Sequence, residues 1–261
     1  MTPEPDHRTA LVTGASSGLG VAFARELARR GWNLVLVARS EAPMQQLADE
    51  LRADGAMVQV HPLDLADAAA REALMANLAG AGVQIDALVN NAGFGVFGDF
   101  ADTDWARLES MLMVDVMALT HLTRLFLPGM RQRGYGRVLQ VASTGAFQPT
   151  PGYAAYAAAK SYVLAFSHAL DEELRDSGVH CTVVSPGVTA TRFLEVSGQR
   201  ATWYQRLTRM EAPAVARRGI DAMLAGRAGV ITGWVNALMA HSIRLTPRVL
   251  SARVAGRLMR N

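Results

Sequence analysis

The segment from Thr9 to Gly31 constrains the fold of this 261-residue chain more than any other stretch. An apolar, β-branched run, Thr9–Thr13, leads into a turn with three glycines, Gly14–Gly20, and then into a helical pattern that Gly31 closes. In such a strand–turn–helix unit the backbone N–H groups and the helix dipole favour a phosphate, and the glycines let it approach the backbone closely. Three glycines alone would predict only a turn, but their place between a strand and a helix predicts a dinucleotide site. The residues expected at this site are Gly14, Ser16, Ser17, Gly18, Leu19 and Gly20.

The end of the second expected strand, Asn33–Val37, indicates which dinucleotide binds. In a dinucleotide-binding βαβ unit this strand end meets the adenosine ribose, and an acidic residue there would hold the 2′-hydroxyl of NAD. The chain has Ala38, Arg39 and Ser40 instead, and a guanidinium suits a 2′-phosphate. We therefore predict that the cofactor is NADP(H) and that Arg39, alone or together with Ser40, binds its 2′-phosphate. A merely solvated arginine is the alternative, which the absence of an acid at this strand end disfavours.

Strand and helix patterns alternate along the chain, which predicts an α/β fold with a parallel sheet and helices on both faces. Further strands are expected at 56–61, 85–89, 137–141, 179–184 and 229–232, and helices at 41–53, 68–78, 104–130, 153–176 and 215–225. We expect Pro128-Gly129 to close the third of these helices. No linker or repeat divides the chain, so residues 1–261 are expected to form a single domain. The pattern loosens over 192–213, which predicts a mobile loop or helical lid over a pocket.

Three other strand ends carry residues that fit a ligand site, because ligands of open α/β sheets bind beyond the carboxyl ends of the strands. Asp64 follows the third strand and either contacts the adenine or caps the following helix. The fourth strand runs into Asn90-Asn91-Ala92-Gly93, which is either a cofactor-facing loop or a plain turn. After the strand at 179–184, a Pro-Gly pair redirects the chain and threonines offer hydroxyls. The residues predicted to meet the cofactor here are Asp64, Asn91, Ala92, Gly93, Pro186, Gly187, Thr189 and Thr191.

Tyr156 and Lys160 lie one helical turn apart in an alanine-rich segment that follows Ser143 and a Pro/Gly-rich loop. A cation beside a phenol favours the phenolate and lowers a pKa that is ordinarily about 10. Lys160 is the only lysine of the chain, and a compact ammonium differs chemically from the guanidinium used elsewhere. A chance lysine on a solvated helix face is the alternative. We prefer the interpretation that Tyr156 is a proton donor working near neutral pH.

Asp115 is the anomaly of the helix expected at 104–130, since it lies within the apolar run Met111–Leu119. The methionines and leucines of this run are most simply core or interface packing. A carboxylate buried among them needs a partner or a functional reason.

Composition and charge disfavour several classes of protein. A net charge of +3, with arginines spread along the chain, does not indicate nucleic-acid binding. Because we find no leader pattern and no run of about 18 apolar residues, we expect no integral membrane segment and a cytoplasmic location. A lone Cys181 excludes an intrachain disulfide, and histidines without ligand spacing predict no metal. The segment after Asp221 holds six arginines and no acid, and we expect an interface edge or a solvated tail there rather than an anionic-surface contact.

Together these motifs resemble the short-chain dehydrogenase/reductase family over nearly the whole chain. Thr13–Gly20 is similar to the TGxxxGxG cofactor motif of that family, Asn90–Gly93 to its NNAG motif and Tyr156–Lys160 to its YxxxK motif. Ser143 resembles the family's catalytic serine. Pro186-Gly187 with Thr191 resembles the motif whose threonine meets the nicotinamide carboxamide. These motifs occur in the family's order and at its spacing.

The resemblance implies a Rossmann-type, doubly wound sheet of about seven strands and an NADP(H)-dependent oxidoreductase that interconverts a carbonyl and an alcohol. It implies that Tyr156 is the acid/base, that Ser143 hydrogen-bonds the reacting oxygen, and that Lys160 holds the ribose and lowers the tyrosine pKa. Asp115 stands where the family commonly has an asparagine that helps to hold a water behind the lysine. Ser143, Tyr156, Lys160 and Asp115 are therefore the candidate catalytic residues.

The resemblance also implies a small-molecule substrate and a homodimer or homotetramer formed through the helices at 104–130 and 153–176. The aromatic residues predicted to form an apolar pocket are Phe94, Phe147, Phe193, Trp203 and Tyr204. The alternative function is an NADP(H)-binding regulator or scaffold of the same fold that has lost catalysis. Asp115 is the only argument for it.

Overall fold

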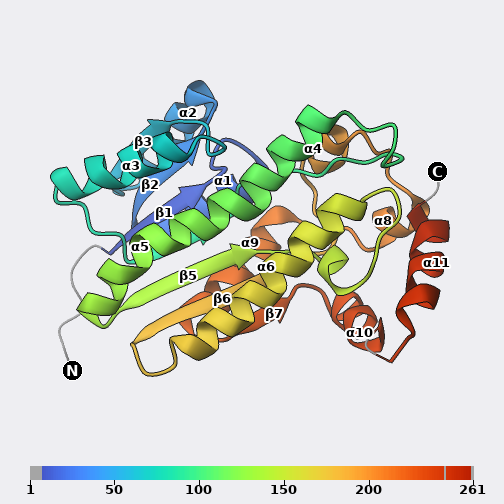
Figure 1. The fold of residues 1–261 in the computed structure, drawn as a ribbon. Helices are drawn as coiled ribbons and strands as arrows, with labels where there is room; N and C mark the ends of the chain where they lie inside the picture. Colours follow the sequence, from blue (N-terminus) through green and yellow to red (C-terminus); the bar gives the residue numbers. More distant parts are fainter. Residues whose placement is uncertain (1–7, 244, 260–261) are drawn as a thin grey trace.

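A seven-stranded parallel sheet forms the centre of the computed structural model, which describes residues 8–243 and 245–259 (Figure 1). The strand order is β3-β2-β1-β4-β5-β6-β7, so the direction of winding reverses between β1 and β4. Ligands of doubly wound sheets bind at the carboxyl ends of the strands beside such a reversal. The predicted fold class is confirmed. The strands are β1 (Thr9–Thr13), β2 (Asn33–Ala38), β3 (Val58–Pro62), β4 (Ala87–Asn90), β5 (Gly136–Val141), β6 (Val179–Ser185) and β7 (Gly229–Ile231).

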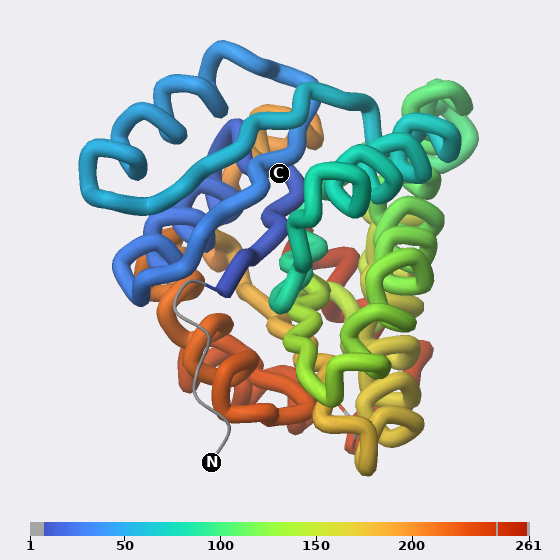
Figure 2. The backbone as a smooth tube through the Cα atoms, turned by 90° about the vertical axis from the view of Figure 1, so that its left-hand side faces the viewer, coloured from blue at the N-terminus to red at the C-terminus, as the bar shows by residue number. Residues whose placement is uncertain are grey.

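Helices cover both faces of this sheet, as the view along a second direction shows (Figure 2). One face packs against α1 (Gly18–Ala28), α2 (Glu41–Ala53) and α9 (Ala212–Leu224) through a continuous apolar core. The other face packs against α3 (Ala68–Gly80), α5 (Leu119–Arg133) and α6 (Ala154–Glu173) through a second core. The inner strands are covered on both sides and are apolar runs such as the fully buried β2, whereas the edge strands β3 and β7 are partly exposed.

The long helix expected at 104–130 differs from the prediction in two respects. It consists of α4 (Trp105–Leu112), a π-helical segment η1 (Met113–Ala118) and then α5, and Asp115 lies in the π-helical part. Pro128 does not close it: proline has a helical φ, and α5 continues to Gly134, whose left-handed conformation (φ 65°) ends the helix.

The continuous helical stretch Trp105–Arg133 is long and apolar enough to cross a membrane by length and composition, with a mean hydropathy of 1.3. This finding is weak evidence for a membrane span, because core helices of globular proteins meet the same criteria. The prediction from the sequence, which required a run of about 18 apolar residues, did not include this stretch.

The part of the chain after β6 holds more helix than the sequence patterns predict. The loosely patterned region contains the short helices α7 (Phe193–Ser197) and α8 (Trp203–Leu207). Two further helices, α10 (Trp234–Ile243) and α11 (Arg248–Met259), follow β7 and lie beyond the carboxyl ends of β6 and β7 (Figure 1). In the part of the chain after β6, the sequence predicted a loop or helical lid, the helix at 215–225 and a final strand, but no helix after that strand.

We predict that Phe23→Ala lowers the free energy of unfolding by about 3–5 kcal/mol, the usual cost of an aromatic-sized cavity. Phe23 of α1 is fully buried, and its ring lies where α9 has Gly219 in place of a side chain. Urea denaturation measures the change. Phe100→Ala is the matched control, since Phe100 is 62% exposed and its loss should change the free energy by well under 1 kcal/mol. Equal effects of the two changes would contradict the assigned core.

Candidate active site

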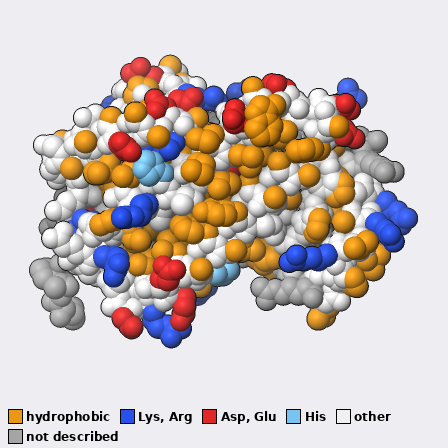
Figure 3. Space-filling model, in the orientation of Figure 1, with side chains coloured by type: hydrophobic (Ala, Val, Ile, Leu, Met, Phe, Trp, Pro, Cys, Tyr) orange, Lys and Arg blue, Asp and Glu red, His pale blue; other side chains and the backbone are white. Residues whose placement is uncertain are grey.

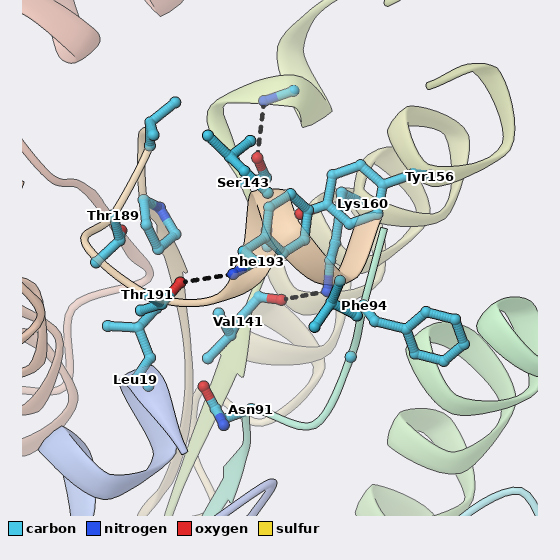
Figure 4. Close-up of a pocket in the computed structure, with 18 of the residues that line it drawn as sticks. Leu19, Asn91, Phe94, Val141, Ser143, Tyr156, Lys160, Thr189, Thr191 and Phe193 are labelled. Atoms are coloured by element: carbon cyan, nitrogen blue, oxygen red, sulfur yellow. Dashed lines mark hydrogen bonds between the residues drawn. The ribbon is translucent and has the colours of Figure 1, made fainter. Parts of the chain in front are cut away.

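A cavity of about 690 Å³ opens at the carboxyl ends of the strands, beside the reversal between β1 and β4. The residues predicted from the sequence to bind a cofactor or to act in catalysis line this cavity, apart from Gly20 and Asp115. Figure 4 shows how Leu19, Asn91, Ser143 and Thr191 reach it from separate parts of the chain, while Tyr156 and Lys160 both come from α6. The structure therefore brings together side chains that the sequence separates by more than a hundred residues.

The glycine turn meets the cavity with its backbone, because α1 begins at Gly18 and Gly14, Ser16 and Ser17 line the wall. Gly20 lies behind them: a methyl group on it would be 2.1 Å from the carbonyl oxygen of Gly14. This glycine therefore lets the first turn of α1 pack directly on the loop. The amino end of a helix and its free N–H groups then face the cavity, an arrangement that favours an anion.

Thr13 and Asn91 join the ends of β1 and β4 beneath this turn. The Thr13 hydroxyl accepts hydrogen bonds from the backbone N–H groups of Asn91 (2.9 Å) and Ala92 (3.0 Å), and the Asn91 amide donates to the Thr13 carbonyl at 2.9 Å. The Asn91 side chain thus holds two strand ends together. Sequence analysis included Thr13 in the Thr13–Gly20 motif but did not assign a role to its side chain.

Arg39 lies at the cavity edge at the end of β2 and is exposed. Within the described residues it has no ion-pair partner, so its charge is available to a ligand. Ser40 and Asp64 line the same edge. The Asp64 carboxylate accepts from the N–H of Ala66 at 2.9 Å, which makes a local turn, while the residue that caps α3 is Asp67. Of the two roles expected for Asp64, capping the helix is therefore wrong.

Asp115 and Lys160 form a buried ion pair behind the cavity, with Oδ2 and Nζ 3.0 Å apart. The contact is an ion pair rather than a well-aligned hydrogen bond, since Oδ2 has no hydrogen-bond partner among the described residues. Lys160 also donates to the carbonyl of Val141 at the end of β5 (3.0 Å), and Asp115 Oδ1 accepts from the N–H of Phe94 (3.0 Å). Burial raises the pKa of Asp115, and the Lys160 ammonium acts against that rise.

The close packing of Asp115 explains the glycine of the NNAG sequence. A methyl group on Gly93 would lie 2.8 Å from Oδ1 of Asp115, so the carboxylate occupies the space that a side chain would need. The loop after β4, the π-helical segment and α6 are thereby fixed on one another through a single acidic side chain. π-Helical bulges are often found at functional sites, which fits the position of Asp115.

Tyr156 faces the cavity beside Ser143, and the surroundings raise its pKa instead of lowering it. Burial in the cavity wall is the largest cause, the negative charge of Asp115 adds to it, and hydrogen bonding with Ser143 acts in the opposite direction. Lys160 Nζ lies 5.7 Å from the centre of the Tyr156 ring and is paired with Asp115. The expectation of a lowered pKa is therefore wrong for the cavity as it stands, because burial, and after it the charge of Asp115, raises the pKa.

Thr191 closes the opposite side of the site. Its hydroxyl accepts from the N–H of Phe193 at 3.3 Å (Figure 4), and its methyl group lies against Gly18, where an added Cβ would be 3.1 Å away. Pro186 and Gly187 line the cavity with Thr189, whose hydroxyl donates to the Gly187 carbonyl at 3.1 Å. The segment after β6 is thus in contact with the glycine turn after β1.

Tyr153 organises the part of the cavity that faces away from the glycine turn, and sequence analysis missed it. Its ring centre is 5.6 Å from that of Tyr156 and 6.3 Å from that of Phe193. Its hydroxyl lies 2.7 Å from Oγ of Ser197 and donates to Oε1 of Gln199 at 3.0 Å. Burial raises the pKa of Tyr153 to about 12, so the hydroxyl stays protonated. No motif marks this residue, but its place three residues before Tyr156 could have suggested it.

A buried amide network extends from Tyr153 through the segment expected to be a lid. Gln205 of α8 donates to Oε1 of Gln199 at 2.8 Å and accepts from the N–H of Thr202 at 2.9 Å. The side chains of Gln199, Thr202 and Gln205 are all buried. These bonds hold α7 and α8 against α6. The mobility of the segment 192–213 stays a prediction.

Apolar side chains line the outer part of the cavity. Of the five aromatic residues predicted there, Phe94, Phe193 and Tyr204 line it. Trp203 is 69% exposed and Phe147 packs beside the core of α6, so neither lines the cavity. The helices that follow β7 contribute unpredicted lining residues: Asn236, Met239, Ala240 and Ile243 of α10 and Met259 of α11. In the described part of the chain, no three His, Cys, Asp or Glu side chains are grouped as metal ligands.

Comparison with known proteins assigns the chain to a family. Residues 8–201 match the family described as short chain dehydrogenase. The "Ketoacyl reductase HetN" of Nostoc sp. (strain PCC 7120 / SAG 25.82 / UTEX 2576) is 33% identical over 209 residues, and the match covers 80% of this chain and 69% of that protein. The "Very-long-chain 3-oxoacyl-CoA reductase" of Anas platyrhynchos is 34% identical over 196 residues, and that match covers 72% of this chain but only 62% of the relative.

The same comparison extends to solved structures. The fold is similar to that of the "Short-chain dehydrogenase from Sphingobium yanoikuyae in complex with NADPH", with a TM-score of 0.81 and 31% identity. The similarity covers 91% of this chain and 94% of that one. It therefore includes nearly all the elements that surround the cavity.

Proposed function

The chain belongs to the short-chain dehydrogenase family of oxidoreductases, and on that premise we propose that it is an NADP(H)-dependent enzyme that interconverts a carbonyl and an alcohol. The observation that carries this proposal is the meeting of Ser143, Tyr156 and Lys160 in one cavity with the glycine turn at the start of α1. Acid–base groups and an anion site are thereby adjacent. Such a cavity suits a phosphate-bearing redox cofactor and a small substrate.

The residues of the cavity fit a dinucleotide. The N–H groups at the start of α1 would hold its pyrophosphate, Arg39 a 2′-phosphate and Thr191 the carboxamide of the nicotinamide ring. Gly14 and Gly18 line this space, and Ala92 and Thr191 pack so closely on them that neither position has room for a side chain. When bound, the nicotinamide supplies or accepts the hydride.

Tyr156 is proposed to donate a proton to the carbonyl oxygen during reduction and to accept it during oxidation. Ser143 lies beside it and donates a hydrogen bond to the same oxygen, which stabilises the charge that develops there. Because burial and the Asp115 charge raise the Tyr156 pKa, the phenol is protonated at neutral pH, the form needed to act as the acid.

The proposed substrate is a carbonyl compound with an apolar chain. Phe94, Phe193, Met239 and Ile243 line the outer cavity and offer an apolar surface to such a chain. Two relatives carry names of reductases that act on ketoacyl groups. A homodimer or homotetramer through α6 and the continuous helical stretch of α4, η1 and α5 also remains part of the proposal. The exposed side chains of Met117 in η1 and Tyr162 in α6 support it.

We predict that Tyr156→Phe lowers kcat by about 10²–10⁴-fold, since it removes the proton donor, while NADPH still binds. Carbonyl-dependent consumption of NADPH and the fluorescence of the bound cofactor measure the two quantities. Tyr162→Phe, two turns further along α6, is the matched control and should keep its activity. A parent protein that binds NADPH and reduces no carbonyl in a broad panel would instead favour the cofactor-binding regulator.

We predict that Arg39→Asp lowers the preference for NADPH over NADH by about 10–100-fold, because it removes a charge-assisted contact and adds an acid that suits the ribose hydroxyl. The ratio of kcat/KM for the two cofactors is the measurement. Arg217→Asp, an equal change of charge on the exposed surface of α9, should leave the ratio as it was. An unchanged ratio in Arg39→Asp would refute the assigned cofactor preference.

We predict that Asp115→Asn shifts the pH profile of alcohol oxidation to lower pH. Oxidation requires the Tyr156 phenolate, so kcat rises as pH increases through the pKa of Tyr156. Removing the Asp115 charge removes one cause of the raised pKa and leaves the Lys160 cation without its counter-charge. The pKa of Tyr156 therefore falls, and the rise in kcat shifts to lower pH. Asp104→Asn is the control, since asparagine caps a helix as well as aspartate does. A shift to higher pH would show that Asp115 acts otherwise.

A further inference from the structure

The surface formed by α10, α11 and the turn between them exposes large apolar side chains next to arginines. We call it the C-terminal surface and define it by Trp234, Leu238, Leu245, Val249, Leu250, Val254, Arg248, Arg253 and Arg257. Leu245 is 90% exposed and Trp234 78% exposed. Contiguous apolar exposure of this kind marks an interaction site rather than ordinary surface. Figure 3 shows hydrophobic and arginine side chains together at the lower right, over α11.

The arginines of the C-terminal surface are not neutralised within the described structure. Some exposed arginines elsewhere pair with carboxylates, as Arg25 does with Glu50 and Arg175 with Glu172. Arg248, Arg253 and Arg257 have no such partner among the described residues, and the sequence contains no Asp or Glu after Asp221. The surface is therefore both apolar and positively charged.

Helical spacing puts the two kinds of side chain on the same faces. On α11, Val249 and Arg253 are one turn apart, as are Leu250 and Val254. On α10, Trp234 and Leu238 form an outward stripe, while Met239 and Ile243 on the other side of the same helix line the cavity. One helix thus separates the C-terminal surface from the candidate substrate site.

We propose that the C-terminal surface binds the surface of an anionic lipid bilayer, with α10 and α11 lying in the headgroup region. This proposal replaces the interface edge or solvated tail that the sequence led us to expect in this segment. Helices of 10 and 12 residues are too short to span a bilayer, but apolar side chains with a tryptophan and arginines suit its interface. Lipid phosphates supply the negative charge that the protein lacks there. A second copy of the chain would bring arginine against arginine, so charge complementarity favours the membrane.

For the enzyme, binding to the bilayer would bring the cavity close to substrate dissolved there. A substrate with an apolar chain dissolves in the bilayer, and the wall of α10 and α11 is the part of the cavity nearest to it. This consequence rests on the proposed function, whereas the binding itself does not.

The test is co-sedimentation of the full chain with vesicles of phosphatidylcholine alone or mixed in equal parts with phosphatidylglycerol. We expect binding to the mixed vesicles that salt weakens, because screening shortens the reach of the arginine charges. Arg253→Gln with Arg257→Gln should weaken binding about 30-fold, since each arginine near an anionic surface contributes about a factor of five. Arg217→Gln with Arg218→Gln on α9 is the charge-matched control and should bind as the parent does.

The apolar part is tested by Trp234→Ser, which should weaken vesicle binding about tenfold, whereas Trp105→Ser on α4, where the side chain is 63% exposed, should not. Tyr156→Phe should bind vesicles normally, so a failure of the proposed chemistry is distinguishable from a failure of this inference. The salt dependence of vesicle binding is measured on the parent protein, so this test does not depend on whether a variant folds. Binding that is absent, equal on both vesicles, or indifferent to Arg253 and Arg257 would overturn the proposal. Loss of a stable oligomer in Trp234→Ser would overturn it too, since the surface would then join two copies of the chain.

Discussion

The buried pair of Asp115 and Lys160 is the interaction around which the site is assembled. A carboxylate and an ammonium removed from water are costly unless each meets the other and further hydrogen-bonding groups. Here the carboxylate meets the backbone after β4 and the ammonium meets the backbone at the end of β5. The pair therefore ties two strand ends, a π-helical segment and α6 together. Removing either member would leave the other charged group buried without its partner.

The reversal of the sheet between β1 and β4 explains why residues distant in sequence meet at this pair. Parallel strands deliver their carboxyl ends to one edge, and the loops that follow β1, β4, β5 and β6 all turn into the same space. Thr13 and Asn91 join two of these loops, and Thr191 packs on Gly18 to join a third. The cavity is a product of this topology, and its chemistry comes from the few side chains at the loop ends.

The sequence predicted those parts whose causes are local. The strand, glycine turn and helix at the start of the chain depend on residues that are adjacent in the sequence. The spacing of Tyr156 and Lys160 is likewise visible within a few residues. The raised pKa of Tyr156 was not predictable in this way, because it depends on Asp115, which is distant in the sequence and reaches Lys160 only in the fold. Tyr153 escaped notice for a similar reason: its partners Ser197 and Gln199 follow 44 and 46 residues later. Similarly, α10 and α11 carry apolar residues on two sides, which blurs the single-face pattern that predicts a helix.

The amide network below Tyr153 has a consequence for how the protein can be altered. The amide groups of Gln199 and Gln205 both lie 3.8 Å from the sulfur of Met259, the last residue of α11. The final helix is thus linked, through two glutamines, to the tyrosine beside the acid–base residue. A polar residue in place of Met259 would remove the sulfur that both amides contact. Changes to this helix therefore act on the wall of the cavity, which Met259 lines, and not on a remote surface.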